Sequence, residues 1–174
     1  MPLSIDSPGP AARSSPSQYL TFELGDEMYA VGTLNVREII EYGPITGVPL
    51  LPASIRGVIN LRGAAVPILD LGVRFRGERT LQTSRTCFVI LEVQTGAVQK
   101  PVGIIVDAVS EVLEIADQDI EPPLKVGNHI RADFLSGIGK LGSGFVLLLD
   151  IGRVLSLEEV EGLANLESLP AATV

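Results

Sequence analysis

The sequence predicts an all-β fold, and three observations carry that prediction. Short apolar runs alternate with polar residues, glycine or proline stands in most of the gaps, and one stretch of strand pattern occurs twice. The run that starts at Gln18 shows the alternation clearly, because Leu20, Phe22 and Leu24 share one face of an extended chain. A second alternating run follows directly after a Gly-Asp pair, so the two runs are predicted to form a hairpin.

Seven further apolar runs are predicted to be strands. They span Val36 to Ile40, Val58 to Leu61, Val66 to Leu71, Cys87 to Val93, Val102 to Val106, Val109 to Ile115 and Phe145 to Ile151. Helix is expected in two places only. Pro52 to Arg56 reads as a short helical turn, and Ser156 can cap a C-terminal helix in which Val160, Leu163 and Leu166 recur at three-residue steps.

The repeat indicates how the strands are organised. GVINLRGAAVPILDL, from Gly57 to Leu71, aligns without gaps on GIGKLGSGFVLLLDI, from Gly137 to Ile151, and VGTLNVREII resembles IIVDAVSEVL, which places Glu38 beside Glu111. Two similar sets of about five short strands favour two small barrels, because closing a sheet removes its exposed edges. A barrel of that size buries little apolar surface alone, so the two are expected to share an apolar core.

Composition bounds the domains and the classes of partner. Residues 1–17 hold four prolines and five serines and are predicted to be a flexible tail, followed by one folded unit over 18–163 and a C-terminal tail over 164–174. The net charge of -8 opposes the phosphate backbone, so nucleic acid is not an expected partner. The longest apolar run, Phe145 to Leu149, is far too short to span a bilayer, and the N-terminus lacks a secretory signal pattern. A cytoplasmic protein without direct membrane insertion is therefore expected.

The chain has one cysteine, Cys87, and one histidine, His129. An internal disulfide is excluded, and no Cys/His zinc cluster can be built from these two residues. Cys87 lies inside an apolar run and is expected to behave as a small hydrophobic residue, whereas His129 is expected to be a polar loop residue. No metal and no cofactor is predicted.

Four segments of the chain resemble the CheW-like family of chemotaxis coupling proteins. They are YLTFELGDEMYAVGTLNVREI, PASIRGVINLRGAAVPILDL, VGIIVDAVSEVLEI and FLSGIGKLGSGFVLLLDI, they follow the order of the family, and the resemblance covers roughly Gln18 to Leu163. The resemblance implies two intertwined SH3-like five-stranded barrels that share an apolar core, with short helices that include one near the C-terminus. It also implies an adaptor without catalysis, recruited to membrane-associated receptor arrays, which binds the regulatory domain of a CheA-type histidine kinase and the cytoplasmic tip of chemoreceptors.

The resemblance also carries site residues over to matching positions. The positions that resemble kinase-binding residues are Val36, Glu38 and Gly57. The positions that resemble receptor-facing residues are Cys87, Val102, Val109 and Val112, and we group with them Arg62, the arginine of the family's NLRG turn. Two positions depart from the family: Cys87 stands where valine is frequent, and Gly32 stands where a polar or acidic residue is common.

Each of these residues has a structural alternative. The repeat places Gly142 opposite Arg62, so strand geometry alone does not demand arginine there, and the guanidinium is either a hot spot for a partner or a solvated turn residue. Glu38 is either an interfacial ion-pair partner or, like Glu111, a residue of strand pairing. The valines form either an exposed docking surface or ordinary core, and their burial will separate these two readings.

Gly137, Gly139 and Gly142 spell GxGxxG and raise the alternative of a small nucleotide-binding protein. That motif requires a helix after the glycines, whereas a strand pattern follows here, so the glycines are interpreted as hairpin glycines. Asp70 and Asp150 end equivalent strands, and their repetition fits turn formation better than paired acids. Two further alternatives stay open, an adaptor of a non-flagellar chemosensory pathway and a purely structural component of kinase clusters.

Overall fold

The structure, a computed structural model, describes residues 17–95, 98–122, 134–142 and 144–154, and the described part of the chain forms two sheets. The first sheet has five strands: β3 (Val36–Glu41), β4 (Ile55–Leu61), β5 (Ala64–Asp70), β6 (Cys87–Thr95) and β7 (Val98–Val106). The second has six: β1 (Ser17–Leu24), β2 (Glu27–Gly32), β8 (Ala108–Ile115), β9 (Ile120–Glu121), β10 (Leu135–Leu141) and β11 (Gly144–Leu149). The helices are short: η1 (Thr33–Asn35), α2 (Leu71–Arg76), η2 (Asp117–Asp119) and α3 (Ile151–Val154).

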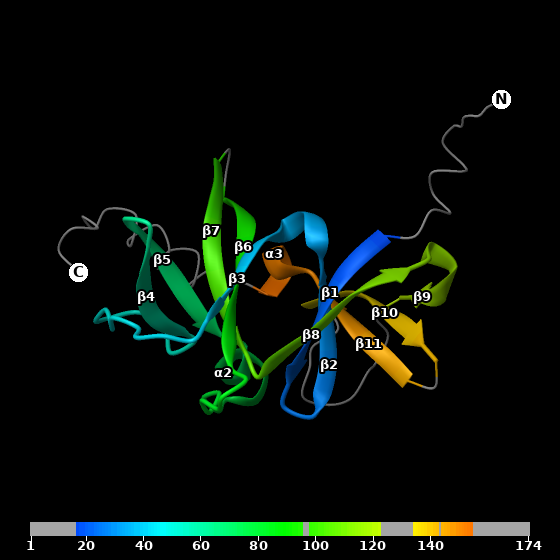
Figure 1. Cartoon of the computed structure of the whole chain (residues 1–174), viewed down its shortest axis with the longest axis horizontal. Helices are drawn as coiled ribbons and strands as arrows, with labels where there is room; N and C mark the ends of the chain where they lie inside the picture. Colours follow the sequence, from blue (N-terminus) through cyan, green and yellow to red (C-terminus); the bar gives the residue numbers. More distant parts are fainter. Residues whose placement is uncertain (1–16, 96–97, 123–133, 143, 155–174) are drawn as a thin grey trace.

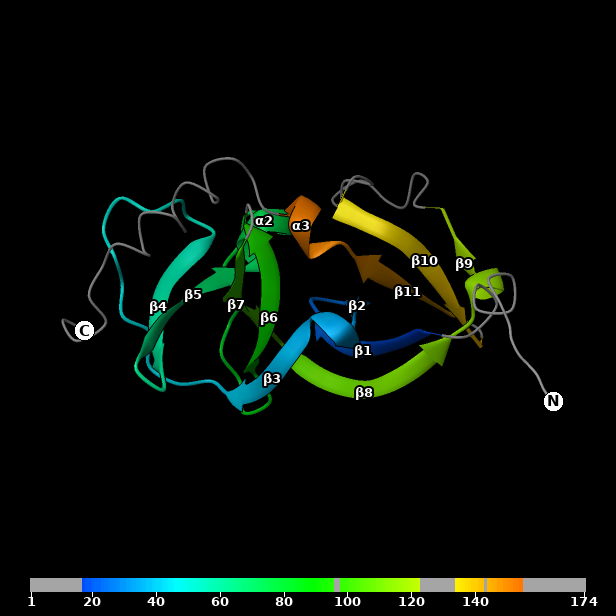
Figure 2. The same cartoon turned by 90° about the horizontal axis from the view of Figure 1, so that it is seen from above.

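The two sheets lie side by side along the long axis of the molecule (Figure 1), and both curl around an interior when seen from above (Figure 2). The strand orders are β3-β6-β7-β5-β4 and β8-β1-β2-β11-β10-β9. The first five strands of the second order match those of the first, with the β1–β2 hairpin in the place that β6–β7 occupies, and β9 is an additional edge strand. The start of the chain therefore completes the sheet built by its end, and the predicted all-β fold with intertwined halves is confirmed.

An isolated bridge brings the two edges of the five-stranded sheet together. After β3 the chain turns back, and Thr46 pairs with Val58 of β4 through N–H···O bonds of 2.8 and 2.9 Å. The repeat aligns Val58 with Ile138, and Ile138 pairs with Glu121 of β9 in the second sheet. The same closing contact thus occurs twice. It supports the SH3-like description of each barrel, which itself stays a prediction.

Alternate residues of the strands pack into separate cores, as the pleat requires. Phe88 and Ile90 of β6 belong to a cluster confined to the five-stranded sheet, whereas Val89, Leu91 and Val93 belong to the largest cluster, which unites both sheets. A third, small cluster belongs to the six-stranded sheet alone. The predicted shared apolar core is therefore present between the two sheets.

Several local predictions need correction. Pro52 to Arg56 is not helical: Ile55 N–H donates to the Pro52 carbonyl at 2.9 Å in a single turn, and Ile55 then pairs with Leu69 as β4 begins. Strand pairing outweighs helix formation here because it continues over the whole of β4. Ser17, placed in the tail, already belongs to β1 and pairs with Ile115.

The strand runs predicted to end at Leu71 and Ile151 end earlier, and each of these residues begins a helix instead, α2 or α3. Neither helix was predicted, because four to six residues are too few to show a helical stripe. The helix predicted from Ser156, His129 and most of both predicted tails lie outside the described residues. No helix within the described ranges is long and apolar enough to cross a membrane.

Candidate functional site

Arg62 occupies the two-residue turn between β4 and β5. Its φ is 52° and that of Gly63 is 88°, the positive pair that a type I′ hairpin turn requires. Asn60 steadies the turn, because its side-chain oxygen accepts the Gly63 N–H at 2.8 Å. Residues other than glycine rarely adopt positive φ, yet arginine stands here, whereas Gly142 has the same φ of 52° at the equivalent turn.

The side chain of Arg62 pairs with Glu38 on β3. Nη1 and Nη2 donate to the two carboxylate oxygens, each at 2.7 Å, in the parallel geometry that makes guanidinium–carboxylate pairs strong. The hydrogen bond from Arg62, opposed by partial desolvation and helped by the charges of Arg62 and Arg37, lowers the pKa of Glu38 below its ordinary range. The same bond raises the pKa of Arg62. The Arg62 side chain is 67% exposed and that of Glu38 22%, so the pair lies on the surface.

Glu38 and Glu111 are equivalent in the repeat but make different hydrogen bonds. Glu38 lies opposite Ile90 in the β3–β6 pair and turns its carboxylate to Arg62. Glu111 contributes its backbone: its N–H donates to Thr21 Oγ1 at 3.1 Å, and Thr21 Oγ1 donates to its carbonyl at 2.8 Å. These bonds satisfy the backbone at a register shift between β1 and β8. Glu38 thus takes part in strand pairing and in an ion pair within the chain, and its contact with a partner stays a prediction.

Gly57 and Val36, the other two positions that resemble kinase-binding residues, are wholly or partly buried and serve packing. Gly57 is buried with a φ of 145°, and a Cβ there would lie 2.2 Å from the Thr46 carbonyl oxygen. Any side chain at position 57 would therefore disturb the bridge that closes the five-stranded sheet. Val36 is half-buried and packs against the shared core. Gly57 allows the close approach of the Thr46 backbone and presents no side chain to a partner.

The apolar residues assigned to the receptor side separate by burial. Val102 has no exposed surface and belongs to the shared core, so it offers no contact to a partner in this conformation. Cys87 and Val109 are half-buried at the margin of that core, where the Cys87 thiol meets the Val109 backbone and burial raises the pKa of the thiol. Val112 is 54% exposed on β8, an edge strand. Of these four, Val112 presents the most surface.

A buried ion pair near this site was missed by sequence reasoning. Asp70 is fully buried, and Arg56 Nη1 donates to it at 2.8 Å. The carboxylate also accepts the Gly72 N–H at 2.9 Å as the N-cap of α2, and the Thr80 N–H and hydroxyl at 2.9 and 2.6 Å. Arg56 Nη2 donates to the Tyr42 hydroxyl at 3.2 Å. The available signal was an arginine within a mainly apolar strand, followed by an aspartate at the end of the next strand.

The glycines of the GxGxxG pattern are explained by packing. Gly137 and Gly139 lie within β10, not in a turn as predicted, and a Cβ on either would approach Ile120 or Val146 to 3.0 Å or less. Gly142 does form the hairpin turn, and β11 follows it instead of a helix, so the context for a pyrophosphate is missing. Within the described part of the chain, no three His, Cys, Asp or Glu side chains gather as a metal site would need.

The fold and these surfaces define a small all-β interaction protein, with an ion pair at an exposed hairpin and an exposed valine on an edge strand. Residues 18–159 match the family model described as the CheW-like domain, and the chain belongs to that family. It is 33% identical over 153 residues to the chemotaxis protein CheW of Treponema pallidum, covering 86% of this chain and 88% of that protein. It is 37% identical over 143 residues to CheW of Klebsiella aerogenes, covering 82% and 84%.

A solved structure agrees with the sequence relatives. The crystal structure of the scaffolding protein TtCheW from Thermoanaerobacter tengcongensis superposes with a TM-score of 0.73 at 30% identity, over 83% of this chain and 90% of that one. Family, relatives and structure together identify a chemotaxis coupling adaptor, so the resemblance inferred from the four segments is confirmed.

Proposed function

We propose that this chain couples chemoreceptors to a CheA-type histidine kinase by holding the kinase regulatory domain on one surface and the cytoplasmic receptor tip on another. The observation that carries the proposal is Arg62, an exposed arginine with positive φ whose equivalent in the repeat is a glycine with the same φ. Folding alone does not explain arginine at this turn. Its guanidinium, oriented by Glu38, is suited to a partner surface.

The ion pair supports this role because it orients the Arg62 side chain and adds little to the stability of the fold. Exposed ion pairs contribute little to stability, since water screens them and holding two long side chains costs entropy. A bidentate pair nevertheless fixes the direction of the guanidinium, which keeps further N–H donors for a carbonyl or carboxylate on a partner. Arg62 and Glu38, assigned separately to the receptor and the kinase, thus form one contact unit between β3 and the β4–β5 turn.

The second proposed surface is the margin of the shared core. Cys87 on β6 and Val109 on β8 meet there, and Val112 adds an exposed apolar side chain on β8 among exposed Ser110, Glu111 and Glu114. Apolar side chains flanked by polar ones suit contact with an amphipathic helix, the element expected at a receptor tip. Docking at both surfaces within an array would raise the effective concentration of each partner for the other, so modest individual contacts would suffice.

The proposal assigns the chain no catalysis and places it in the cytoplasm, brought to the membrane by its receptors. Two alternatives predict different results. An adaptor of a non-flagellar pathway would bind a kinase and receptor of that pathway instead, and a purely structural array component would leave signalling unchanged when Arg62 is replaced.

Calorimetric titration of the purified chain with the kinase regulatory domain from its own cell, and separately with a receptor-tip fragment, tests the proposal. Saturable binding to both is expected. Val112→Ser should weaken receptor binding more than kinase binding, with Phe145→Ser, an exposed apolar residue 63% accessible on β11, as the matched control. Absence of binding to both partners at low and moderate salt would contradict the proposal.

A further inference from the structure

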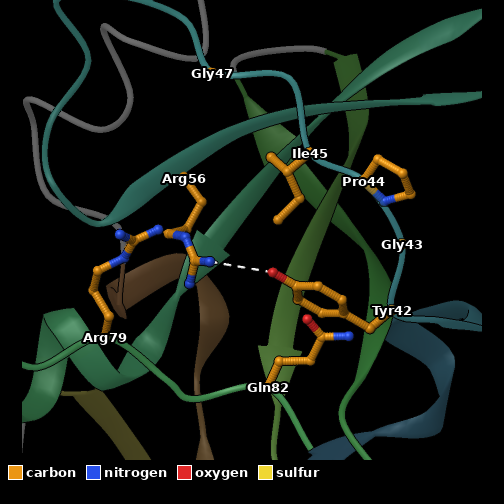
Figure 3. Close-up of a pocket in the computed structure, with 8 residues that line it drawn as sticks. All are labelled: Tyr42, Gly43, Pro44, Ile45, Gly47, Arg56, Arg79 and Gln82. Carbon is orange, nitrogen blue, oxygen red and sulfur yellow. Dashed lines mark hydrogen bonds between the residues drawn. The ribbon is translucent and has the colours of Figure 1, made fainter.

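A pocket lies beside residues 42–47, the segment that closes the five-stranded sheet (Figure 3). It is separate from the Arg62–Glu38 pair and from the margin of the shared core. Its volume is about 630 Å³, within the range of small-ligand sites. The walls come from the segment after β3, from β4 and from the loop after α2. The lining residues are Tyr42, Gly43, Pro44, Ile45, Gly47, Arg56, Arg79 and Gln82.

Arg56 is fixed in place at the inner wall of this pocket. Its side chain is 14% exposed and is held by Asp70 on one nitrogen and by the Tyr42 hydroxyl on another. These bonds use two of the five N–H donors of a guanidinium. The group is thus oriented before any ligand arrives, which lowers the entropy cost of binding.

Arg79 supplies charge that no described residue neutralises. Figure 3 shows its side chain extending toward Arg56, with both arginines across the pocket from Tyr42 and Gln82. Asp70 balances the charge of Arg56, but no carboxylate of the described residues lies within ion-pair distance of Arg79. In a chain of net charge -8, this pocket is therefore a local site of positive charge.

The remaining wall leaves room for a ligand beside the two arginines. A Cβ added at Gly43 or Gly47 would meet no atom within 4 Å, so the backbone there faces open space. Gln82 adds an amide that can donate or accept beside the Tyr42 ring. Two guanidinium groups and an amide around one space form a donor set for an anion with several oxygen atoms.

We propose that this pocket binds an oxyanion, a carboxylate or phosphate group, between Arg56 and Arg79. The group is either free in solution or carried by an acidic side chain of another protein. The site is separate from the Arg62–Glu38 pair, and its existence does not depend on the coupling role. Because the 42–47 segment forms both the pocket wall and the Thr46–Val58 bridge, an occupied pocket also stabilises the closed sheet.

Amide NMR titrations of the full chain with citrate, inorganic phosphate and an acetylated, amidated tetraglutamate peptide, at constant ionic strength, test the proposal. Arg79→Gln removes the unbalanced charge without touching the core. Arg85→Gln is the matched control, because Arg85 lies in the same loop, pairs with Glu23 and does not line the pocket. A thermal melt of each variant with and without the best probe provides a second readout.

Saturable shifts confined to residues 42–47, to Arg56 and its neighbours in β4, and to residues 79–82 are expected with at least one probe, weakened about tenfold by Arg79→Gln and unchanged by Arg85→Gln. The probe should raise the melting temperature of the native chain and of Arg85→Gln but not that of Arg79→Gln. A preference for citrate or phosphate would indicate a free anion, and a preference for the peptide an acidic side chain. Shifts without saturation, or equal binding by Arg79→Gln, would overturn the proposal.

Discussion

The β4–β5 and β10–β11 hairpins occupy equivalent places in the two sheets and differ in what they carry. Arg62 stands at the first turn and Gly142 at the second, with the same φ of 52°. Asp70 is fully buried and pairs with Arg56. Asp150 caps the start of α3, pairs with Arg153, and has a side chain that is 37% exposed. The positive φ of the turn and the aspartate at the strand end are common to both hairpins. The first hairpin carries two further interactions, the Arg62–Glu38 and Arg56–Asp70 ion pairs.

The largest expected difference between the halves concerns the two aspartates. Asp70→Ala removes one partner of a buried ion pair and leaves Arg56 without its carboxylate, which should cost about 3–5 kcal/mol in the free energy of unfolding. Asp150→Ala removes an exposed cap and should cost about 1 kcal/mol. Urea unfolding of both variants measures the difference, and equal losses would show that the buried network adds no more to stability than the exposed cap does.

The next largest difference is expected in the loss of stability when alanine replaces Gly57 or Gly137, the two glycines at the start of the repeat. Gly57→Ala combines a positive φ with a Cβ only 2.2 Å from a backbone oxygen, and should cost about 3 kcal/mol. Gly137→Ala would bring a Cβ to 2.6 Å from Ile120 Cγ2 and 3.1 Å from the Glu121 carbonyl oxygen, contacts less close than that at position 57 and without a positive φ, so a cost of about 1–2 kcal/mol is expected.

Urea unfolding measures the stability loss of each glycine variant, and hydrogen exchange of the Thr46 amide reports on the closing bridge. Faster exchange in Gly57→Ala alone is expected, because that amide bonds to Val58 across the closing bridge. Were Gly57→Ala as stable as the native chain, the bridge would not depend on glycine. Kinase binding by variants at position 57 therefore has to be interpreted together with their stability.

The smallest effect concerns the ionisation of Glu38. Its pKa lies below the ordinary value of 4.5, chiefly because Arg62 donates to the carboxylate. The pair's contribution to stability is therefore complete above pH 4.5 and is lost as the pH falls through the lowered pKa. Arg62→Gln should raise the pKa of Glu38 toward 4.5, and Arg37→Gln should raise it less because Arg37 is the weaker cause. Carbon NMR of the Glu38 carboxyl during an acid titration measures both shifts, and equal shifts would contradict the pairing.

Much of the fold was predictable because the alternation and the repeat are local properties of the sequence. The Gly57–Leu71 and Gly137–Ile151 repeat located both hairpins, and the placement of Gly142 opposite Arg62 anticipated the shared turn. The exchange of the β1–β2 hairpin into the second sheet was not visible in the periodicity. It depends on pairing between distant segments, such as Tyr29 with Leu147, which periodicity does not encode.

The candidate site was only partly predictable, for the same reason. Glu38 and Arg62 were each selected, but they were assigned to different partners because nothing local shows that residues 24 positions apart meet. Val102 was selected from a resemblance and is core, since a valine in a strand looks the same on either face. The Arg56–Asp70 pair was missed because a buried charge is recognised only once its partner is placed.

The central claim is that Arg62 serves binding and not folding, and Arg62→Gly tests it most directly. Glycine suits the positive φ, so the variant should unfold at nearly the same temperature as the native chain while its affinity for the kinase domain or the receptor tip falls about tenfold or more. Gly142→Arg, at the equivalent turn, should leave both affinities unchanged. Calorimetric titration of the three proteins decides: unchanged affinities in Arg62→Gly, or a loss of affinity matched by a loss of stability, would contradict the claim.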